Sequence, residues 1–161
     1  MKLKYLLVIF SFVPLLYLTS CSGNDDTATT DMEINATMTI NGKVEIFKFF
    51  GHGINTREEG NELSIDLIRE ETEPFNEKLI RIVHPYQETG RNITNRFIYS
   101  EKTDDSFLEG DFLNGEFESN IITSTNNLFQ ATFSGTHTIQ GKEIIITDGK
   151  ITYRFEGPIL E

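Results

Sequence analysis

Cys21 is the only cysteine in this chain of 161 residues, and its thiol is the strongest nucleophile that the sequence offers. It follows an apolar run from Leu6 to Leu18, which itself follows Lys2 and Lys4. A cationic start, a short apolar run and small residues before a cleavage point are typical of a secretory signal. The run is well short of the ~20 residues that a membrane-spanning helix needs. We therefore predict a cleaved signal over residues 1–20.

The residues that lead into this cysteine, Leu18-Thr19-Ser20-Cys21, resemble the lipobox of bacterial lipoproteins. In that family the thiol is diacylated, the signal is cut before the cysteine, and the new amine is acylated. The resemblance thus implies lipidation of Cys21 and a lipid-anchored protein of the outer membrane, since several acyl chains give durable anchoring. The alternative is an ordinary signal with a stray cysteine. Either way, a single cysteine allows no disulfide framework.

Residues 21–32 show no apolar periodicity, which predicts a flexible tether between the lipid and the body of the protein. Asp25 and Asp26 resemble the acidic surface-export signal of some outer-membrane lipoproteins, although two uncharged residues dilute it. The surface-exposed and periplasmic faces of the membrane both remain open. Asp26-Thr27-Ala28 also resembles a bacterial O-glycosylation acceptor, with Thr27 as the modified residue.

The predicted mature chain is strongly acidic. Removing the signal takes away two lysines, which leaves 12 basic against 25 acidic residues and a net charge of about −13 with histidine neutral. Nucleic acid and anionic lipid surfaces both select a basic face. The total charge therefore argues against a nucleic-acid partner and against a protein that lies flat on anionic lipid.

Residues that often carry catalysis form no known motif here. His52, His84 and His137 have no metal-ligand spacing, and neither a nucleophile elbow nor a Gly-rich phosphate loop is present. We predict a non-enzymatic protein with no cofactor and no metal. The stretch Asp104–Asp111 carries four carboxylates that could gather around Ca²⁺, but their spacing fits no EF-hand loop. A solvated acidic loop is the favoured interpretation.

From Glu33 onward, short runs alternate apolar and polar residues with a period of two, which predicts strands. Asn41-Gly42 between two such runs predicts a hairpin, because a type I′ turn requires positive φ at both positions. Gln140-Gly141 and Asp148-Gly149 are predicted turns as well. The pattern predicts an all-β domain over residues 33–161, an antiparallel β-sandwich of about eight to ten short strands. A small lipocalin-like β-barrel is the alternative.

The last third of the chain shows the alternation most clearly. Phe129, Ala131 and Phe133 are predicted to face the core, with Thr132 on the opposite face. The final strand is predicted to point Ile151, Tyr153 and Phe155 inward. Stretches at both ends of this body resemble a family of small uncharacterised all-β lipoproteins, and they are Thr37 to Lys43, Phe129 to Thr136, and Ile146 to Ile151. The resemblance implies an all-β domain on a lipid tether and carries no functional residue.

Two stretches are longer than a hairpin requires, Gly51 to Gly60 and His84 to Asn95, and both are predicted loops. Loops of sandwich domains are free to bind, because the strands are committed to the core. The candidate binding residues are His52, Arg57, Tyr86, Gln87 and Arg91, whose arginines could select an anionic partner. We therefore expect a binding or interaction module for a protein or glycan. The alternative is a lipocalin-like carrier of an apolar molecule.

Overall fold

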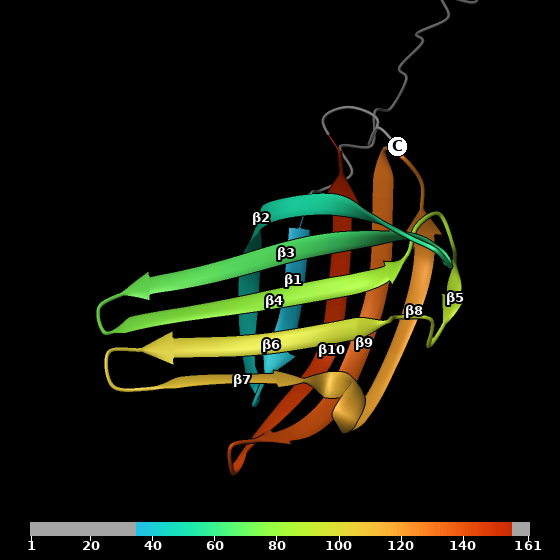
Figure 1. The fold of residues 1–161 in the computed structure, drawn as a ribbon. Helices are drawn as coiled ribbons and strands as arrows, with labels where there is room; N and C mark the ends of the chain where they lie inside the picture. The colour runs from blue at the N-terminus through green and yellow to red at the C-terminus, as the bar shows by residue number, and fades with distance from the viewer. Residues whose placement is uncertain (1–34, 156–161) are drawn as a thin grey trace, which may run out of the picture. The chain divides into compact units, whose positions relative to one another are not determined.

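The computed structural model describes residues 35–155, so the predictions for Cys21, Thr27, the signal and the tether lie outside the described residues. The described part contains ten β-strands and one short 3₁₀ turn (Figure 1). In chain order these are β1 (Asn35–Ile40), β2 (Lys43–Arg57), β3 (Gly60–Thr72), β4 (Phe75–Pro85), β5 (Gly90–Arg91), β6 (Arg96–Thr103), β7 (Phe107–Asp111), η1 (Phe112–Asn114), β8 (Glu116–Ser124), β9 (Leu128–Ile139) and β10 (Lys142–Arg154).

All ten strands form one antiparallel sheet in the order β5-β8-β9-β10-β1-β2-β3-β4-β6-β7. The sheet curls because β2 belongs to two layers: its first part pairs with β1 as far as Phe47, and its second part pairs with β3 from Lys48 onward. A register shift between Phe49 and Gly51 marks a bulge at this transition. Strands β3, β4, β6 and β7 therefore cross in front of β1, β10, β9 and β8 (Figure 1). The prediction of an all-β, antiparallel fold is confirmed, as a half-barrel whose two layers pack face to face.

The core lies between these two layers and is built from alternate residues of each strand. The predicted inward face of β9 is buried, and Phe129 on this strand and Leu63 on β3 are fully inaccessible. Burial of this kind contributes about 25 cal/mol per Å² of apolar surface, and it is the main term that stabilises a domain without disulfides. The largest fully buried side chains are Tyr99, Phe97, Phe112, Phe129, Met38, Leu63, Ile65, Leu67, Ile80, Ile82, Ile144 and Ile146.

Two of the three predicted tight turns are present. Asn41 and Gly42 have φ values of 48° and 81°, and Gln140 and Gly141 have 51° and 81°. Positive φ at both central positions is what a type I′ turn requires, and its twist matches that of the flanking strands. The hairpins β1–β2 and β9–β10 therefore form where the sequence places them.

The predicted turn at Asp148-Gly149 is wrong, because β10 continues through it. Ile146 lies opposite Gly135 and Gly149 lies opposite Phe133, so two residues of β10 face the single residue between them on β9. This is a β-bulge, and it uses positive φ at Asp148 (52°) as a turn would. A Cβ atom at position 149 would lie 2.6 Å from the carbonyl oxygen of Phe133, so the bulge requires glycine there.

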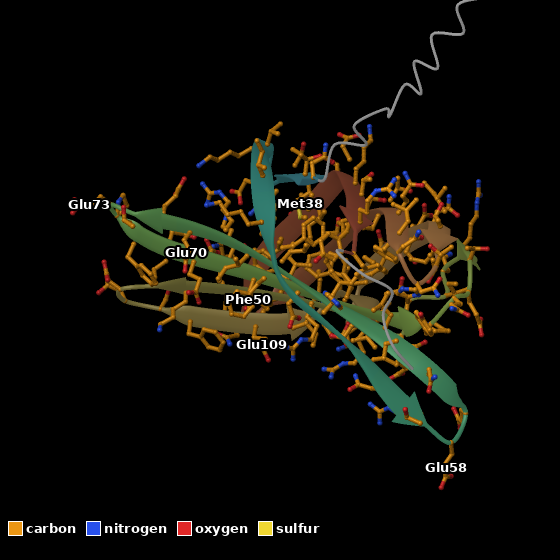
Figure 2. All side chains as sticks on the ribbon, turned by 90° about the horizontal axis from the view of Figure 1, so that it is seen from above. Met38, Phe50, Glu58, Glu70, Glu73 and Glu109 are labelled. Atoms are coloured by element: carbon orange, nitrogen blue, oxygen red, sulfur yellow. The ribbon has the colours of Figure 1, made fainter. Side chains whose placement is uncertain are left out.

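The predicted loop from Gly51 to Gly60 is also wrong. Strand β2 runs on to Arg57, and only Glu58 and Glu59 form the turn into β3. Figure 2 shows Glu58 at the far tip of this hairpin, which extends past the neighbouring strands. Its outer residues are polar on both sides because no second layer covers them, and this polarity resembles that of a loop. The other predicted loop is a true connection over residues 86–95, interrupted only by β5.

No helix among residues 35–155 is long and apolar enough to cross a membrane.

Candidate binding site

An open pocket of about 880 Å³ lies at the base of the β2–β3 hairpin tip, where the β4–β5 connection approaches it. Sites for small ligands typically measure about 300–1,000 Å³, so this pocket has a suitable size. Three segments that are distant in sequence meet here, namely the hairpin tip, the residues after β4, and the start of β6. The lining residues are Arg57, Glu58, Glu59, Gly60, Asn61, Glu62, Pro85, Tyr86, Glu88, Asn95 and Arg96.

The structure brings together two of the five predicted binding residues. Arg57 from β2 and Tyr86 from the β4–β5 connection line the same pocket. Gln87 follows Tyr86 and is exposed, and its backbone N–H donates to Ser124 Oγ at 3.1 Å. His52 and Arg91 lie elsewhere. The predicted site is therefore partly assembled, around one residue from each stretch.

Arg57 does not present a free guanidinium to the pocket. Its Nε donates to Glu62 Oε2 at 3.0 Å, and Asn95 Nδ2 donates to the other oxygen of the same carboxylate at 2.8 Å. The hydrogen bond from Asn95 and the charge of Arg57 together lower the pKa of Glu62. The lining carries four glutamates and two arginines, so its charge is −2 at neutral pH. The structure therefore does not support capture of an anion by Arg57.

Tyr86 serves the core more than the pocket surface. Only 9% of the residue is exposed, and its backbone N–H donates to the carbonyl oxygen of Asn61 at 2.8 Å. The hydroxyl is buried and has no hydrogen-bond partner among residues 35–155. Tyr86 thus fixes the β4–β5 connection against β3 and forms one wall of the pocket, without offering a flat exposed ring. Its replacement by alanine would lower stability as well as any binding.

His84, two residues earlier, points into the core and is fully buried. Its ring lies 4.9 Å from that of Phe129 on the opposite layer, and neither ring nitrogen has a hydrogen-bond partner in the described part of the chain. Burial lowers the pKa of His84 from 6.5 to about 4, because an imidazolium ion would be poorly solvated there. His84 is therefore uncharged at physiological pH, and its ring packs in the core as an apolar side chain would.

Acid should destabilise the protein through His84. The unfolded chain takes up this proton near pH 6.5, whereas the folded chain resists it until about pH 4. The stabilisation is therefore complete above pH 6.5 and is lost as the pH falls towards 4. At 1.36 kcal/mol per pKa unit, the loss reaches about 3 kcal/mol.

Urea unfolding over this pH range measures the effect. We expect His84→Leu to remove most of the decline, because the variant has no proton to take up at this site. His52→Gln is the matched control, since His52 is exposed, and it should keep the wild-type slope. A His84→Leu variant that declined as steeply as the wild type would contradict the assignment.

His52 belongs to an aromatic cluster between β2 and the end of β10. Its ring lies 4.9 Å from Phe155 and 5.9 Å from Tyr153, and Tyr153 stacks on Phe49 at 3.9 Å. The cluster lies at the junction where β2 leaves the first layer and pairs with β3. His52 therefore packs at the exposed rim of this aromatic cluster and does not line the pocket.

Arg91 lines a second, smaller hollow of about 580 Å³ on the outer face of β8, β9 and β10. Its neighbours there include Thr132, Asp148 and Lys150. Strand β5 pairs with β8 at the edge of the first layer, whereas Arg57 lies on the hairpin that leads into the second layer. Arg91 is close to Tyr86 in sequence, but it does not line the pocket that Tyr86 lines.

The carboxylates of Asp104–Asp111 do not converge. Asp104 and Asp105 lie exposed in the β6–β7 turn, while Asp111 accepts hydrogen bonds from the backbone N–H groups of Phe97 and Leu113, each at 3.2 Å. Asp111 thus caps the short η1 turn. Within residues 35–155, no three His, Cys, Asp or Glu side chains are arranged to hold a metal ion.

Sequence reasoning missed a buried ionic network between the layers. Lys78 Nζ lies 2.6 Å from Glu45 Oε1 and 3.9 Å from Glu101 Oε1, and Lys142 Nζ lies 2.6 Å from Glu101 Oε2. Arg69 adds a longer contact of 3.7 Å to Glu45. The available signal was that three of these charges occupy the inward phase of their strands: Glu45 with Phe47, Lys78 with Ile80, and Glu101 with Tyr99.

Electrostatics within this network favour ionised carboxylates. Burial alone would raise the pKa of Glu101, but hydrogen bonds from Lys142 and Asn76 outweigh that effect and lower it. Burial also raises the pKa of Tyr99, whose hydroxyl lies near the charges of Glu101 and Glu45. Arg69 also pairs with Glu71, and neither of the two pockets is lined by residues of the network. It therefore serves to join the layers.

Comparison with known proteins gives no further assignment. Neither a family model, nor a curated protein, nor a solved structure matches the chain.

Proposed function

We propose that this protein is a lipid-anchored protein of the outer envelope and a non-catalytic binding module, with its ligand site in the pocket at the β2–β3 hairpin. The observation that carries the proposal is the meeting of Arg57, Tyr86 and Asn95 in one pocket from three separate segments. Binding sites are commonly built this way, with loops and turns held by a rigid β-scaffold. The anchor rests on the lipobox-like sequence at Cys21.

The ligand is a neutral, hydroxyl-rich molecule, for which an oligosaccharide is the natural class. The pocket offers carboxylates and amides, which can accept and donate hydrogen bonds to neighbouring hydroxyl groups. Its net charge of −2 disfavours anions, and its one ring, that of Tyr86, is mostly covered. Recognition therefore depends on polar groups such as Glu88 and Asn95 more than on stacking.

The alternative of an internal apolar ligand finds less support. In a lipocalin-like carrier, the ligand would occupy the space between the layers. Here that space contains the packed rings of Phe97, Phe112 and Phe133, with Phe97 4.8 Å from Phe133 and 5.6 Å from Phe112. A bound apolar molecule would have to displace these side chains from a close-packed core.

A glycan array probed with labelled protein tests the proposed site. We expect the wild type to bind some oligosaccharides and the double variant Glu88→Ala/Asn95→Ala to lose at least about tenfold in affinity, since each lost polar contact costs roughly 1 kcal/mol or more. Arg91→Ala is the matched control, because Arg91 lines a different hollow and should leave binding intact. Wild-type affinity in the double variant would exclude this pocket. Binding to no glycan on the array would exclude the proposed ligand class.

A further inference from the structure

Three large apolar side chains stand exposed along the outer face of β2. Val44 is 70% exposed and Ile46 and Phe50 are each 68% exposed, whereas Glu45 and Phe47 between them are buried. The apolar residues thus take the solvent side of the strand and a carboxylate takes the core side. Isolated apolar residues on a surface need no explanation, whereas neighbouring ones that form a contiguous patch rimmed by polar residues mark an interaction surface.

Unpaired cations gather on the same side of the layer. Lys48 continues the exposed row of β2, and Lys150 and Arg154 are exposed on β10, beyond β1. None of these three has an ion-pair partner within residues 35–155, where most other lysines and arginines do. We refer to Val44, Ile46, Phe50, Lys48, Lys150 and Arg154 as the basic-apolar face.

The register of the strands shows that these residues share one surface. Thr37 of β1 lies opposite Ile46 on one side and Lys150 on the other, so the three form a row across the sheet. Thr39 likewise lies between Val44 and Thr147. The carboxylates exposed nearby include Asp148, in the bulge beside Lys150, Glu118, which lines the same hollow as Lys150, and Glu143, near the β9–β10 turn. On a chain with a net charge of about −13 after signal removal, three cations beside these three carboxylates make this face much less acidic than the chain as a whole.

The described part of the chain begins on a strand of this layer. Ala36 of β1 lies opposite both Phe47 and Ile151, so β1 runs between β2 and β10. The predicted lipid attachment point, Cys21, is 14 residues before Asn35. At ~3.5 Å per residue, such a segment spans at most about 50 Å. A lipid at Cys21 would therefore allow the basic-apolar face, like any other face of a domain of this size, to reach the bilayer.

We propose that the basic-apolar face rests on a bilayer that carries anionic headgroups. Val44, Ile46 and Phe50 enter the boundary between headgroups and acyl chains, and Lys48, Lys150 and Arg154 contact lipid phosphates. The total charge of the chain predicted that the protein would not lie flat on anionic lipid. However, charges more than a Debye length away, about 8–10 Å, are largely screened. The charges on the face itself therefore decide whether it contacts the lipid. The inference rests on the proposed lipid anchor, which holds the domain at the surface.

A second copy of the chain fits this face less well. A stable protein–protein interface buries about 800 Å² per partner and favours a contiguous apolar centre. Three exposed apolar side chains with threonines beside them fall short of that, and like cations would face one another across a symmetric contact. A bilayer meets both requirements of the face, since it supplies an apolar interior and negative charge.

Depth-dependent fluorescence quenching tests the contact. The full chain is reconstituted into vesicles of phosphatidylcholine and phosphatidylglycerol, with an environment-sensitive fluorophore on Ile46→Cys. Phe107→Cys is the matched control, because Phe107 is 57% exposed but lies on β7 in the other layer. The wild type, treated in parallel, reports any free thiol at Cys21. We expect a nitroxide-bearing lipid to quench the label at 46 at least about threefold more than the label at 107, and 0.5 M salt to weaken that quenching.

The outcomes separate the contact from the anchor. Equal quenching of both labels, in protein that floats with the vesicles, would overturn the basic-apolar face as a membrane contact and leave the anchor standing. A label at 46 that is shielded from aqueous iodide but not reached by the lipid quencher would indicate a protein occupant and also overturn it. Flotation of the wild type with loss of flotation in Cys21→Ser reports the lipid anchor. A wild type that does not float contradicts both proposals.

Discussion

Replacing Lys78 by methionine should destabilise the protein by about 3–5 kcal/mol, which is the cost of leaving a buried charge without its partner. The side chain of Glu45 is 1% exposed, and its Oε1 depends on Lys78 Nζ at 2.6 Å. The remaining cation near Glu45 is Arg69 at 3.7 Å. Methionine keeps most of the apolar stem of the lysine, so the loss reports the charge. The free energy of unfolding in urea measures it.

A second substitution separates the pair from its packing. In Glu45→Met/Lys78→Met both buried charges are gone, and replacement of a buried ion pair by apolar residues of similar volume is often close to neutral. We expect the double variant to be more stable than Lys78→Met alone, with a coupling of at least about 1 kcal/mol in a double-mutant cycle. Glu101 keeps Lys142 at 2.6 Å and Asn76 at 3.0 Å in both variants. Additive effects of the two substitutions would show that the contact contributes little.

The fold followed from the sequence wherever one face of a strand is buried. Alternation predicted the inward residues of β9, because a period of two separates a core face from a solvent face. It failed on the outer part of β2, since the hairpin beyond the second layer has no buried face to mark it. It also misread Asp148-Gly149, because a bulge and a tight turn both use positive φ. The local sequence predicts positive φ at these residues. It does not show which strand lies opposite them, and that neighbour decides between a bulge and a tight turn.

The candidate site was predictable only in part, for a topological reason. Arg57 and Tyr86 meet because β3 pairs with both β2 and β4, which brings the β2–β3 tip and the end of β4 to one edge. Arg91 is close to Tyr86 in sequence but pairs with Asn120 of β8 on the other layer. Strand order decides which loops share a pocket, and it depends on contacts that no local pattern contains. The polar residues Asn95 and Glu88 were missed for the same reason.

The basic-apolar face shows that the net charge of a chain does not describe the charge of each of its surfaces. The total of about −13 correctly describes an acidic chain, but it averages over surfaces that face different ways. Lys48 and Lys150 are far apart in sequence and come together because β1 lies between β2 and β10. The net charge of the whole chain does not show that these lysines lie on the same surface. Partner predictions from total charge therefore hold only where the charges are evenly spread.

Phe133→Ala should cost about 3–5 kcal/mol, the range for truncation of a large buried aromatic side chain. Phe133 is 6% exposed, and its ring lies 4.8 Å from that of Phe97 on the facing layer. Its loss leaves a cavity at the centre of the core beside the bulge of β10. The same strand supplies the matched control, because Thr132 points to the outer face and Thr132→Ala should cost less than about 1 kcal/mol.

Urea unfolding of the two variants compares neighbouring residues in one strand, so backbone and strand propensity are nearly constant. Domains of this size are stable by about 5–15 kcal/mol, and a loss of 3–5 kcal/mol could leave Phe133→Ala partly unfolded at 37 °C. Gly149 limits relaxation at this site, since the backbone of β10 already lies against Phe133 and is fixed by the bulge. A cavity that cannot collapse places the expected cost in the upper part of the range. Equal losses in Thr132→Ala and Phe133→Ala would contradict the assignment of Phe133 to the core face of β9 and of Thr132 to its outer face.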